Sequence, residues 1–100
     1  MSEEIDNFVL TLNSEDGIHK NTIISYKYDI NQFNNFIKKK KKNFKLITKK
    51  DILDFLESLK LKNVKNKTKS RKIFALKRFY KFLISERIIK RNPIENIDIP

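Results

Sequence analysis

The chain has 100 residues and a formal net charge of +11, with 39% hydrophobic residues, one glycine, two prolines and no cysteine. This length suits one small domain with a single core, and the missing cysteines exclude a disulfide framework and a cysteine-based zinc site. Because the first residues are acidic and no apolar run approaches 18 residues, we expect neither a secretory signal nor a membrane span. With so few glycines and prolines to mark turns, the composition predicts an all-helical domain.

Charge is unevenly distributed along the chain. Residues 1–16 hold five acidic side chains and no basic one, whereas residues 60–91 hold thirteen basic side chains and one acidic one. Such segregation points to an anionic partner surface. An A·T-rich coding sequence is an alternative explanation for nineteen lysines against four arginines. It does not explain why residues 60–91 hold a single acidic side chain.

The first half of the chain predicts two helices. Ser2 is placed to cap a first helix through about Leu12, and the polar stretch 13–17 ends it. Asn21 or Thr22 is placed to cap a second helix, which the five lysines 38–42 close. The apolar residues of these helices recur at helical spacing: Ile5, Phe8, Val9 and Leu12 in the first, and Ile23, Tyr26, Ile30, Phe33 and Ile37, with Phe36 beside them, in the second.

The second half predicts two further long helices and a short one. Thr48 and Asp51 have the spacing of a capping box with Asp in place of Glu, and an apolar helical pattern follows from Ile52 to Leu59. After a basic loop at 60–66, a fourth helix is expected from about Lys67 to Ser85. Asn92 and Pro93 are placed to open a short fifth helix, with Asn as cap and Pro in the first position.

The segment 67–83 is the most informative part of the chain, because it joins a buried-helix pattern to seven basic side chains and no acidic one. One helical face is apolar, and the basic residues fall largely off that face. The N-terminus of a helix also presents free backbone amides and a partial positive charge to anions. The apolar face consists of Ile73, Leu76, Phe79, Tyr80 and Leu83. We therefore expect this helix to pack one side and offer the other to a phosphate backbone.

Catalysis finds little support in these residues. The single histidine, His19, lies in a predicted turn, where solvation is expected rather than a role as general base. The sequence contains no glycine-rich phosphate loop and no His/Asp cluster with metal-ligand spacing, so we expect no cofactor and no metal. Tyr26 and Tyr80 are expected at the edge of the core with their hydroxyl groups in water.

Binding residues are predicted at two helix starts. Thr22, Ser25 and Lys27 place hydroxyls and a charge beside the first amides of the second helix, although ordinary helix capping is the alternative. The stronger patch comprises Lys67, Thr68, Lys69, Ser70, Arg71 and Lys72, with Lys62 and Lys65 extending it. Within that patch, Arg71 is the best candidate for a base-edge or bidentate phosphate contact, because its planar fork does what a lysine cannot. A solvated charged face is the alternative, and the run 38–42 is expected to give diffuse steering at most.

Three motifs in order resemble one protein family. Residues 21–33, NTIISYKYDINQF, are similar to the pattern N-T-x-x-x-Y-x-x-D-L-x-x-F of the core-binding domain of tyrosine recombinases, the phage integrase and Xer family. The pattern T68-x-x-R71-x-x-x-x-L76-x-R78-F79-Y80-x-F82-L83 resembles the last long helix of that domain, and residues 88–94 resemble its G-x-I-x-x-N-P exit. Arg87 departs from the family by replacing a Gly or another small turn residue. The likeness covers about residues 5–100.

The resemblance implies a fold, a function and a division of labour. The fold is an orthogonal all-α bundle of four main helices plus a short C-terminal helix (SAM-like), with residues 1–96 as the core-binding domain and 97–100 as the start of a linker to a catalytic domain. The function is duplex DNA binding as the N-terminal clamp arm in site-specific recombination and integration, with the two basic helix starts approaching the major groove. Catalytic residues, including the nucleophilic tyrosine, belong to the other domain, so Tyr26, Tyr28 and Tyr80 are not nucleophiles and this chain alone has no activity.

The resemblance also implies partners and a location. Other recombinase protomers are expected to join it in a synaptic complex, while the isolated chain is expected to be monomeric, to avoid membranes and to act on cytoplasmic, nucleoid DNA. Two alternatives stay open. A stand-alone helical DNA-binding regulator would favour a tight helix-turn-helix, often with a turn glycine, which these loops lack. A basic helical protein-interaction module would bind an acidic partner instead of DNA.

Overall fold

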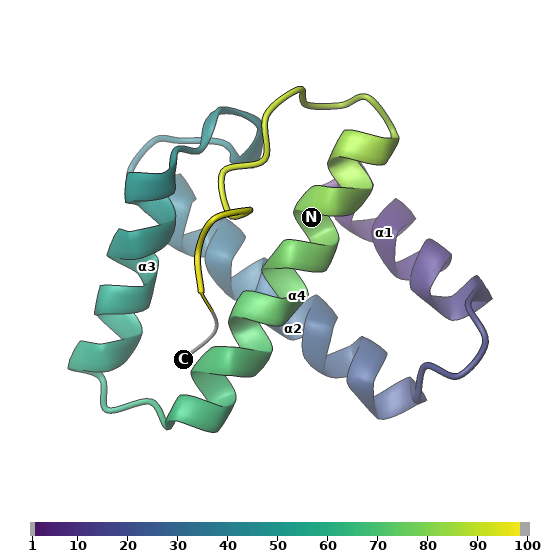
Figure 1. Ribbon diagram of the computed structural model, residues 1–100, viewed down its shortest axis with the longest axis horizontal. Helices are drawn as coiled ribbons and strands as arrows, with labels where there is room; N and C mark the ends of the chain where they lie inside the picture. The colour runs from purple at the N-terminus through teal and green to yellow at the C-terminus, as the bar shows by residue number, and fades with distance from the viewer. Residues whose placement is uncertain (1, 99–100) are drawn as a thin grey trace.

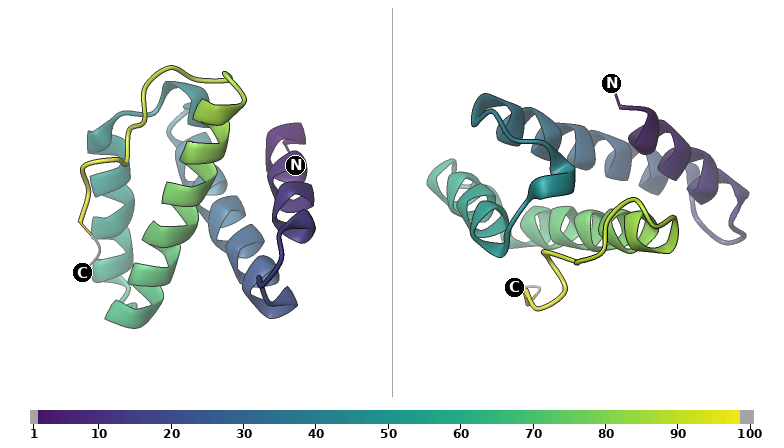
Figure 2. Two further views of the ribbon diagram at one scale, coloured as in Figure 1. Left: turned by 45° about the vertical axis from the view of Figure 1, so that its right-hand side comes forward. Right: turned by 90° about the horizontal axis from the view of Figure 1, so that it is seen from above.

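The computed structural model describes residues 2–98, and this part of the chain is helical without a β-strand. Figure 1 shows α4 crossing in front of α2, with α3 on one side and α1 on the other. Seen from above in Figure 2, α1 and α2 lie behind α3 and α4, and the C-terminal segment runs along the front. The elements are α1 (Glu3–Ser14), α2 (Lys20–Lys39), the 3-10 turn η1 (Phe44–Leu46), α3 (Lys49–Leu61) and α4 (Asn66–Ser85). The prediction of an all-α bundle with four main helices is confirmed.

Two helices begin at the caps that the sequence predicts. The backbone N–H of Ile5 donates to Ser2 Oγ at 3.1 Å, which caps α1. At α3, the N–H of Asp51 donates to the Thr48 hydroxyl oxygen while the N–H of Thr48 donates to Asp51 Oδ2 at 2.9 Å. Both partners of the capping box are therefore present, and Asp replaces Glu without loss of the reciprocal bond.

The cap of α2 differs from the expected one. His19, not Asn21 or Thr22, is the N-cap, and its Nδ1 accepts from the backbone N–H of Asn21 at 3.0 Å. The helix begins at Lys20 and so includes both predicted caps in its first turn. An imidazole nitrogen is an acceptor when it carries no proton, which explains how a residue outside the usual capping set replaces them.

Three helices end in the same way. Lys41, Asn63 and Arg87 have φ of 59°, 58° and 58° and follow the ends of α2, α3 and α4. In each case the next residue donates its backbone N–H to a carbonyl five positions earlier, as Ile88 does to Leu83 at 2.9 Å. This is the hydrogen bond of a Schellman motif, whose left-handed residue is usually glycine. Here no glycine marks these three helix ends.

An aromatic cluster joins the elements at the centre of the fold. Phe33 of α2 lies 5.1 Å, centroid to centroid, from Phe55 of α3, and Phe79 of α4 lies 5.4 Å from Phe8 of α1 and 5.5 Å from Phe44 of η1. All these pairs are edge-to-face, the arrangement that the ring quadrupole favours. Every element thus contributes a phenylalanine to one core.

Tyr80 belongs to this core and not to its edge. Its side chain is fully buried, and its hydroxyl donates to the carbonyl oxygen of Phe44 at 2.9 Å. Burial is the main reason why the pKa of the phenol lies well above its ordinary range, and the negative charge of Asp51 raises this pKa further. The expectation of a hydroxyl in water is therefore wrong for Tyr80, because the carbonyl of η1 takes the place of water.

The segment after α4 forms a turn where a short fifth helix was expected. Asn92 Oδ1 accepts from the N–H of Ile94 at 3.1 Å, but the helix that Asn92 was predicted to cap is absent. Residues 93–96 make only a turn, closed by the N–H of Ile97 on the Ile94 carbonyl. One turn already brings Ile94 and Ile97 to the core, where they are 0% and 5% exposed. Ile97, expected in the linker, is thus packed; residues 99–100 of that linker lie outside the described residues.

Candidate nucleic-acid interface

The starts of α2 and α4 lie at one edge of the molecule. In Figure 1 both helices begin at the lower edge, and the left panel of Figure 2 shows the same relationship from another side. The two helices then cross, so their first turns are held at fixed positions by the core between them. The binding residues predicted from the sequence lie in the first two or three turns of these helices or at the α4 cap, except Lys62, which is the C-cap of α3.

The start of α4 is the more strongly basic of the two. Lys65 is its N-cap, and it makes no side-chain capping hydrogen bond, unlike Ser2, His19 and Thr48 at the other three helices. The first backbone N–H groups of α4 therefore lack the side-chain partner that the other helices supply. Free amides of this kind, with the helix dipole, favour an anion.

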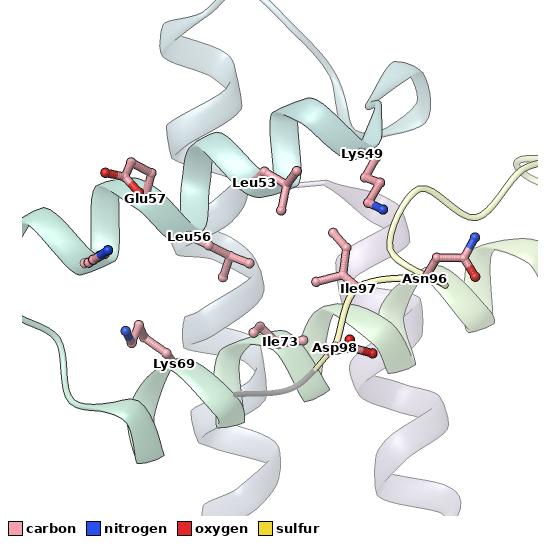
Figure 3. Close-up of a pocket in the computed structure, with 10 residues that line it drawn as sticks. Lys49, Leu53, Leu56, Glu57, Lys69, Ile73, Asn96, Ile97 and Asp98 are labelled. Atoms are coloured by element: carbon pink, nitrogen blue, oxygen red, sulfur yellow. The ribbon is translucent and has the colours of Figure 1, made fainter.

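The lysines at this helix start are without acidic partners within the described residues. Lys65 and Lys67 are exposed, and Lys69 is half-buried, as are Thr68 and Ser70. Figure 3 shows Lys69 at the rim of a groove between α3 and α4, on the side that faces Leu56 and Glu57. Lys69 is therefore turned toward α3, away from the α2 side of the helix.

The start of α2 contributes less charge. Thr22, Ser25 and Lys27 are all half-buried. The backbone N–H of Thr22 already donates to the His19 carbonyl at 3.0 Å, so the first turn of α2 is partly satisfied by its own cap. The predicted cluster at this start is present as three neighbouring polar residues on adjacent turns, with one positive charge among them.

A buried ion cluster joins the two helices. Asp29 on α2 is fully buried, and it accepts from Arg71 Nε at 2.9 Å, from Arg71 Nη2 at 2.7 Å and from Lys72 Nζ at 2.8 Å. The bond to Asp29 raises the pKa of the Arg71 guanidinium, and burial opposes that effect. A carboxylate with no water around it needs such partners, since an unpaired buried charge is costly.

This cluster separates Arg71 from Lys72. The Arg71 side chain keeps 40% of its surface exposed, whereas Lys72 as a whole is only 4% exposed. Lys72 was expected off the apolar face, and its actual position inside the fold removes it from the surface that a ligand reaches. Its ammonium group is used within the protein, to neutralise Asp29.

Sequence reasoning missed two residues of this region. Asp29 lies on the inward side of α2, three positions after Tyr26 and four before Phe33, and an acid in that position was the available signal of a buried ion pair. Tyr28 is 62% exposed, and Lys72 Nζ lies 5.1 Å from the centre of its ring. Tyr28 therefore covers the buried ammonium and presents its outer side next to Arg71.

Most ion pairs of the described residues lie elsewhere. Lys42 Nζ contacts Asp51 Oδ1 at 2.5 Å, and Lys40 and Lys50 both contact Asp54 Oδ2, at 3.1 and 2.9 Å. The pairs of Lys40 and Lys42 join the end of α2 to the start of α3, so the lysine run 38–42 is partly neutralised, while Lys50 and Asp54 pair within α3. At the α4 start, by contrast, Lys65, Lys67 and Lys69 have no acidic partner within the described residues, whereas Arg71 and Lys72 are paired with Asp29.

Residues 2–98 contain neither a metal-binding cluster nor a membrane-spanning helix. No group of three His, Cys, Asp or Glu side chains in this range is placed to hold a metal ion. None of the helices described is long and apolar enough to cross a membrane.

The fold and the two helix starts define a small helical domain with one basic edge, and comparison of the sequence identifies its family. Residues 5–87 match the family model described as phage integrase, N-terminal SAM-like domain. The chain belongs to this family. The resemblance inferred from the three sequence motifs is therefore confirmed.

Individual relatives agree with this assignment. A protein named tyrosine recombinase XerD from Rickettsia bellii is 38% identical over 98 residues, which is 98% of this chain and 32% of the relative. Tyrosine recombinase XerC from Herpetosiphon aurantiacus is 35% identical over 101 residues, which is 100% of this chain and 33% of the relative. Tyrosine recombinase XerC from Bacillus licheniformis is 35% identical over 94 residues, 93% of this chain and 31% of the relative.

The chain thus spans about a third of the length of the curated relatives that it matches. No solved structure matches it significantly.

Proposed function

We propose that this chain binds duplex DNA through the starts of α2 and α4, as the N-terminal clamp arm of a tyrosine site-specific recombinase. The observation that carries the proposal is the group of lysines at the α4 start, Lys65, Lys67 and Lys69, which have no acidic partner within the described residues. Family membership supplies the class of partner, and an uncompensated basic edge is the electrostatic feature that a phosphate backbone requires.

The proposed division of labour follows from the relatives. They are named tyrosine recombinases, and this chain corresponds to about a third of each. The parent protein is accordingly proposed to be an enzyme that breaks and rejoins DNA with residues outside this chain, on cytoplasmic DNA and together with other protomers. The chain itself binds one face of the duplex and so positions a site for the rest of the enzyme.

Salt dependence of binding tests the proposal. A labelled mixed-sequence DNA duplex is titrated with the chain, and anisotropy gives the affinity at several salt concentrations. If about six basic side chains neutralise phosphates, the logarithm of the affinity falls with the logarithm of the salt concentration at a slope of about −5. Absence of duplex binding at low salt would overturn the proposal.

A pair of charge-matched variants then locates the surface. Lys67→Ala with Lys69→Ala removes two positive charges at the α4 start, and we expect a loss of affinity of at least about tenfold and a slope shallower by about 2. Lys38→Ala with Lys39→Ala removes the same charge at the far end of α2. An equal loss of affinity in both double variants would show that binding follows net charge alone. The α4 start would then not be the DNA-binding surface.

A further inference from the structure

Asp29 is a carboxylate that faces no solvent and is held by two cations at once. Its Oδ2 accepts from Arg71 Nε at 2.9 Å, and its Oδ1 accepts from both Arg71 Nη2 at 2.7 Å and Lys72 Nζ at 2.8 Å. Lys72 is buried, whereas Arg71 is 40% exposed through its side chain. The carboxylate is therefore fixed from inside the protein by Lys72 and itself fixes a side chain that reaches the surface.

The geometry of the guanidinium group determines what remains free. Arginine has five N–H donors in a rigid plane. Asp29 uses one N–H of Nε and one of Nη2, which lie along one edge of the fork. The adjacent edge carries an N–H of Nη1 and the second N–H of Nη2 side by side, and no described residue accepts from them. Because the first edge is held, the direction of the second edge is held as well.

We infer that Asp29 is the positioning residue that aims the free edge of Arg71 at DNA. The inference rests on the proposed function and names the contact within it. Two parallel donors fit two neighbouring acceptors, which are either two oxygens of one phosphate or O6 and N7 of one guanine in the major groove. Asp29 itself contacts no DNA; it acts only through Arg71.

The location of the cluster supports this role. Arg71 lies one and a half turns into α4, close behind the unpaired lysines of its start, and Tyr28 of α2 lies exposed beside it. A free arginine at such a place would lose side-chain entropy on binding, because its rotamers would have to be fixed by the DNA. Asp29 fixes them during folding instead, so the contact is preorganised.

Substitution of Asp29 by Asn separates the positioning effect from the charge effect, because the two predict opposite changes in DNA affinity. The variant Asp29→Asn raises the net positive charge by one, so electrostatics alone strengthens DNA binding. Asn keeps one acceptor oxygen, but its amide nitrogen is a donor and cannot accept the second bond, so the parallel pair of bonds that fixes the guanidinium is lost. We expect affinity for a mixed-sequence duplex to fall about tenfold, the order of one bidentate contact. Asp16→Asn, an exposed acid with the same change of charge, is the matched control, and its affinity should be unchanged or slightly higher.

A second variant protects the test against a loss of folding. Arg71→Lys keeps the charge and an ion pair with Asp29 but removes the fork, and we expect it to bind about tenfold more weakly. In the Arg71→Lys background, Asp29→Asn should cause no further loss, because there is no fork left to position. Helix content and thermal unfolding of each variant are measured by circular dichroism, and binding is compared at a temperature where all are folded.

Two duplexes distinguish the acceptor. A duplex of A·T pairs only and a mixed-sequence duplex of equal length carry the same phosphates, but only the second carries guanine. A loss in Asp29→Asn on both duplexes assigns the contact to a phosphate, and a loss confined to the mixed duplex assigns it to guanine.

The outcomes also separate this inference from the proposed function. If the wild-type chain binds duplex DNA but Arg71→Lys binds equally well, the fork makes no contact and the inference is overturned while the proposed function stands. The inference is likewise overturned if Asp29→Asn binds as tightly as Asp16→Asn. If the wild-type chain does not bind duplex DNA at low salt, both are overturned.

Discussion

Asp29 on α2 and Arg71 on α4, 42 positions apart in the sequence, are joined by two parallel hydrogen bonds of 2.9 and 2.7 Å. Lys72 completes the neutralisation from inside the fold. Because of these bonds, Arg71→Ala would change the surface and would also remove one of the two cations that neutralise the buried Asp29 carboxylate. A variant of Arg71 that loses its charge is therefore no clean test of DNA binding.

Removal of Asp29 is expected to destabilise the fold strongly. Asp29→Ala leaves the Lys72 ammonium buried without a counter-charge, and breaking a buried pair in this way costs about 3–5 kcal/mol. Urea unfolding followed by circular dichroism measures the change in the free energy of unfolding. Asp16→Ala, which removes an exposed carboxylate, should change it little. A loss under about 1 kcal/mol for Asp29→Ala would show that Lys72 reaches water by a small movement.

The hydroxyl of Tyr80 is expected to contribute to stability through a single bond. Tyr80→Phe preserves the ring in the aromatic cluster but leaves the Phe44 carbonyl without its donor. A buried acceptor left unpaired costs about 1–3 kcal/mol, so we expect a decrease of that order in the free energy of unfolding. Tyr28→Phe is the matched control, since Tyr28 is 62% exposed. Equal stabilities of the two variants would contradict this account.

The sequence predicted the helices well because their apolar spacing is regular. The residues expected on the inward faces of α1 and α2, among them Ile5, Phe8, Ile30 and Phe33, are buried. The Thr48–Asp51 capping box was also visible, since both of its partners lie within four residues of each other. Patterns of this kind involve only residues close together in the sequence, so they can be predicted from it.

The candidate site was less predictable, because its decisive contact is not local. Lys72 stands four residues before Leu76 and eight before Tyr80, so its spacing places it on the apolar face of the helix. Its charge nevertheless favours solvent, and the partner that lets it be buried, Asp29, belongs to another helix. The helix ends were also obscured, since Lys41 and Arg87 adopt the left-handed conformation that glycine usually marks. At both ends the conformation goes with a Schellman hydrogen bond, from Lys42 to Ile37 and from Ile88 to Leu83, which no residue type announces in the sequence.

This helix end offers a stabilising substitution. Arg87 has φ of 58° after α4, where a side chain is strained by about 1–2 kcal/mol relative to glycine. Glycine also gives the unfolded chain more freedom, so we expect Arg87→Gly to gain about 1 kcal/mol or less in the free energy of unfolding. Glu86, one position earlier, has φ of −89°. Glu86→Gly should therefore lower stability, and a gain in both variants would mean that φ is not the cause.

Asp51, at the start of α3, is expected to make the stability of the fold sensitive to acid. Asp51 is 2% exposed, and it accepts from Lys42 and from the N–H and hydroxyl of Thr48. Burial alone raises the pKa of Asp51, but the bonds from Lys42 and Thr48 outweigh burial and lower the pKa from 3.8 to about 2. The folded-state pKa thus lies below the unfolded one, so the ionised carboxylate stabilises the fold above about pH 4, and this contribution is lost as the pH falls from about 4 to about 2.

Urea unfolding of the wild type and of Asp51→Asn across this pH range isolates the effect. At neutral pH we expect the variant to be less stable by about 1–2 kcal/mol, since Asn keeps one acceptor oxygen for the capping box but loses the charge that pairs with Lys42. The difference should shrink steadily below about pH 4, where the wild-type carboxylate gains its proton. The pKa of Asp54 is also lowered, by Lys50 and then Lys40, so the wild type loses further stability in acid from that group. Because Asp54 is present in both proteins, its effect cancels when the two are compared. If the stability difference between wild type and variant stayed constant down to about pH 2, Asp51 would act by its shape and not by its charge.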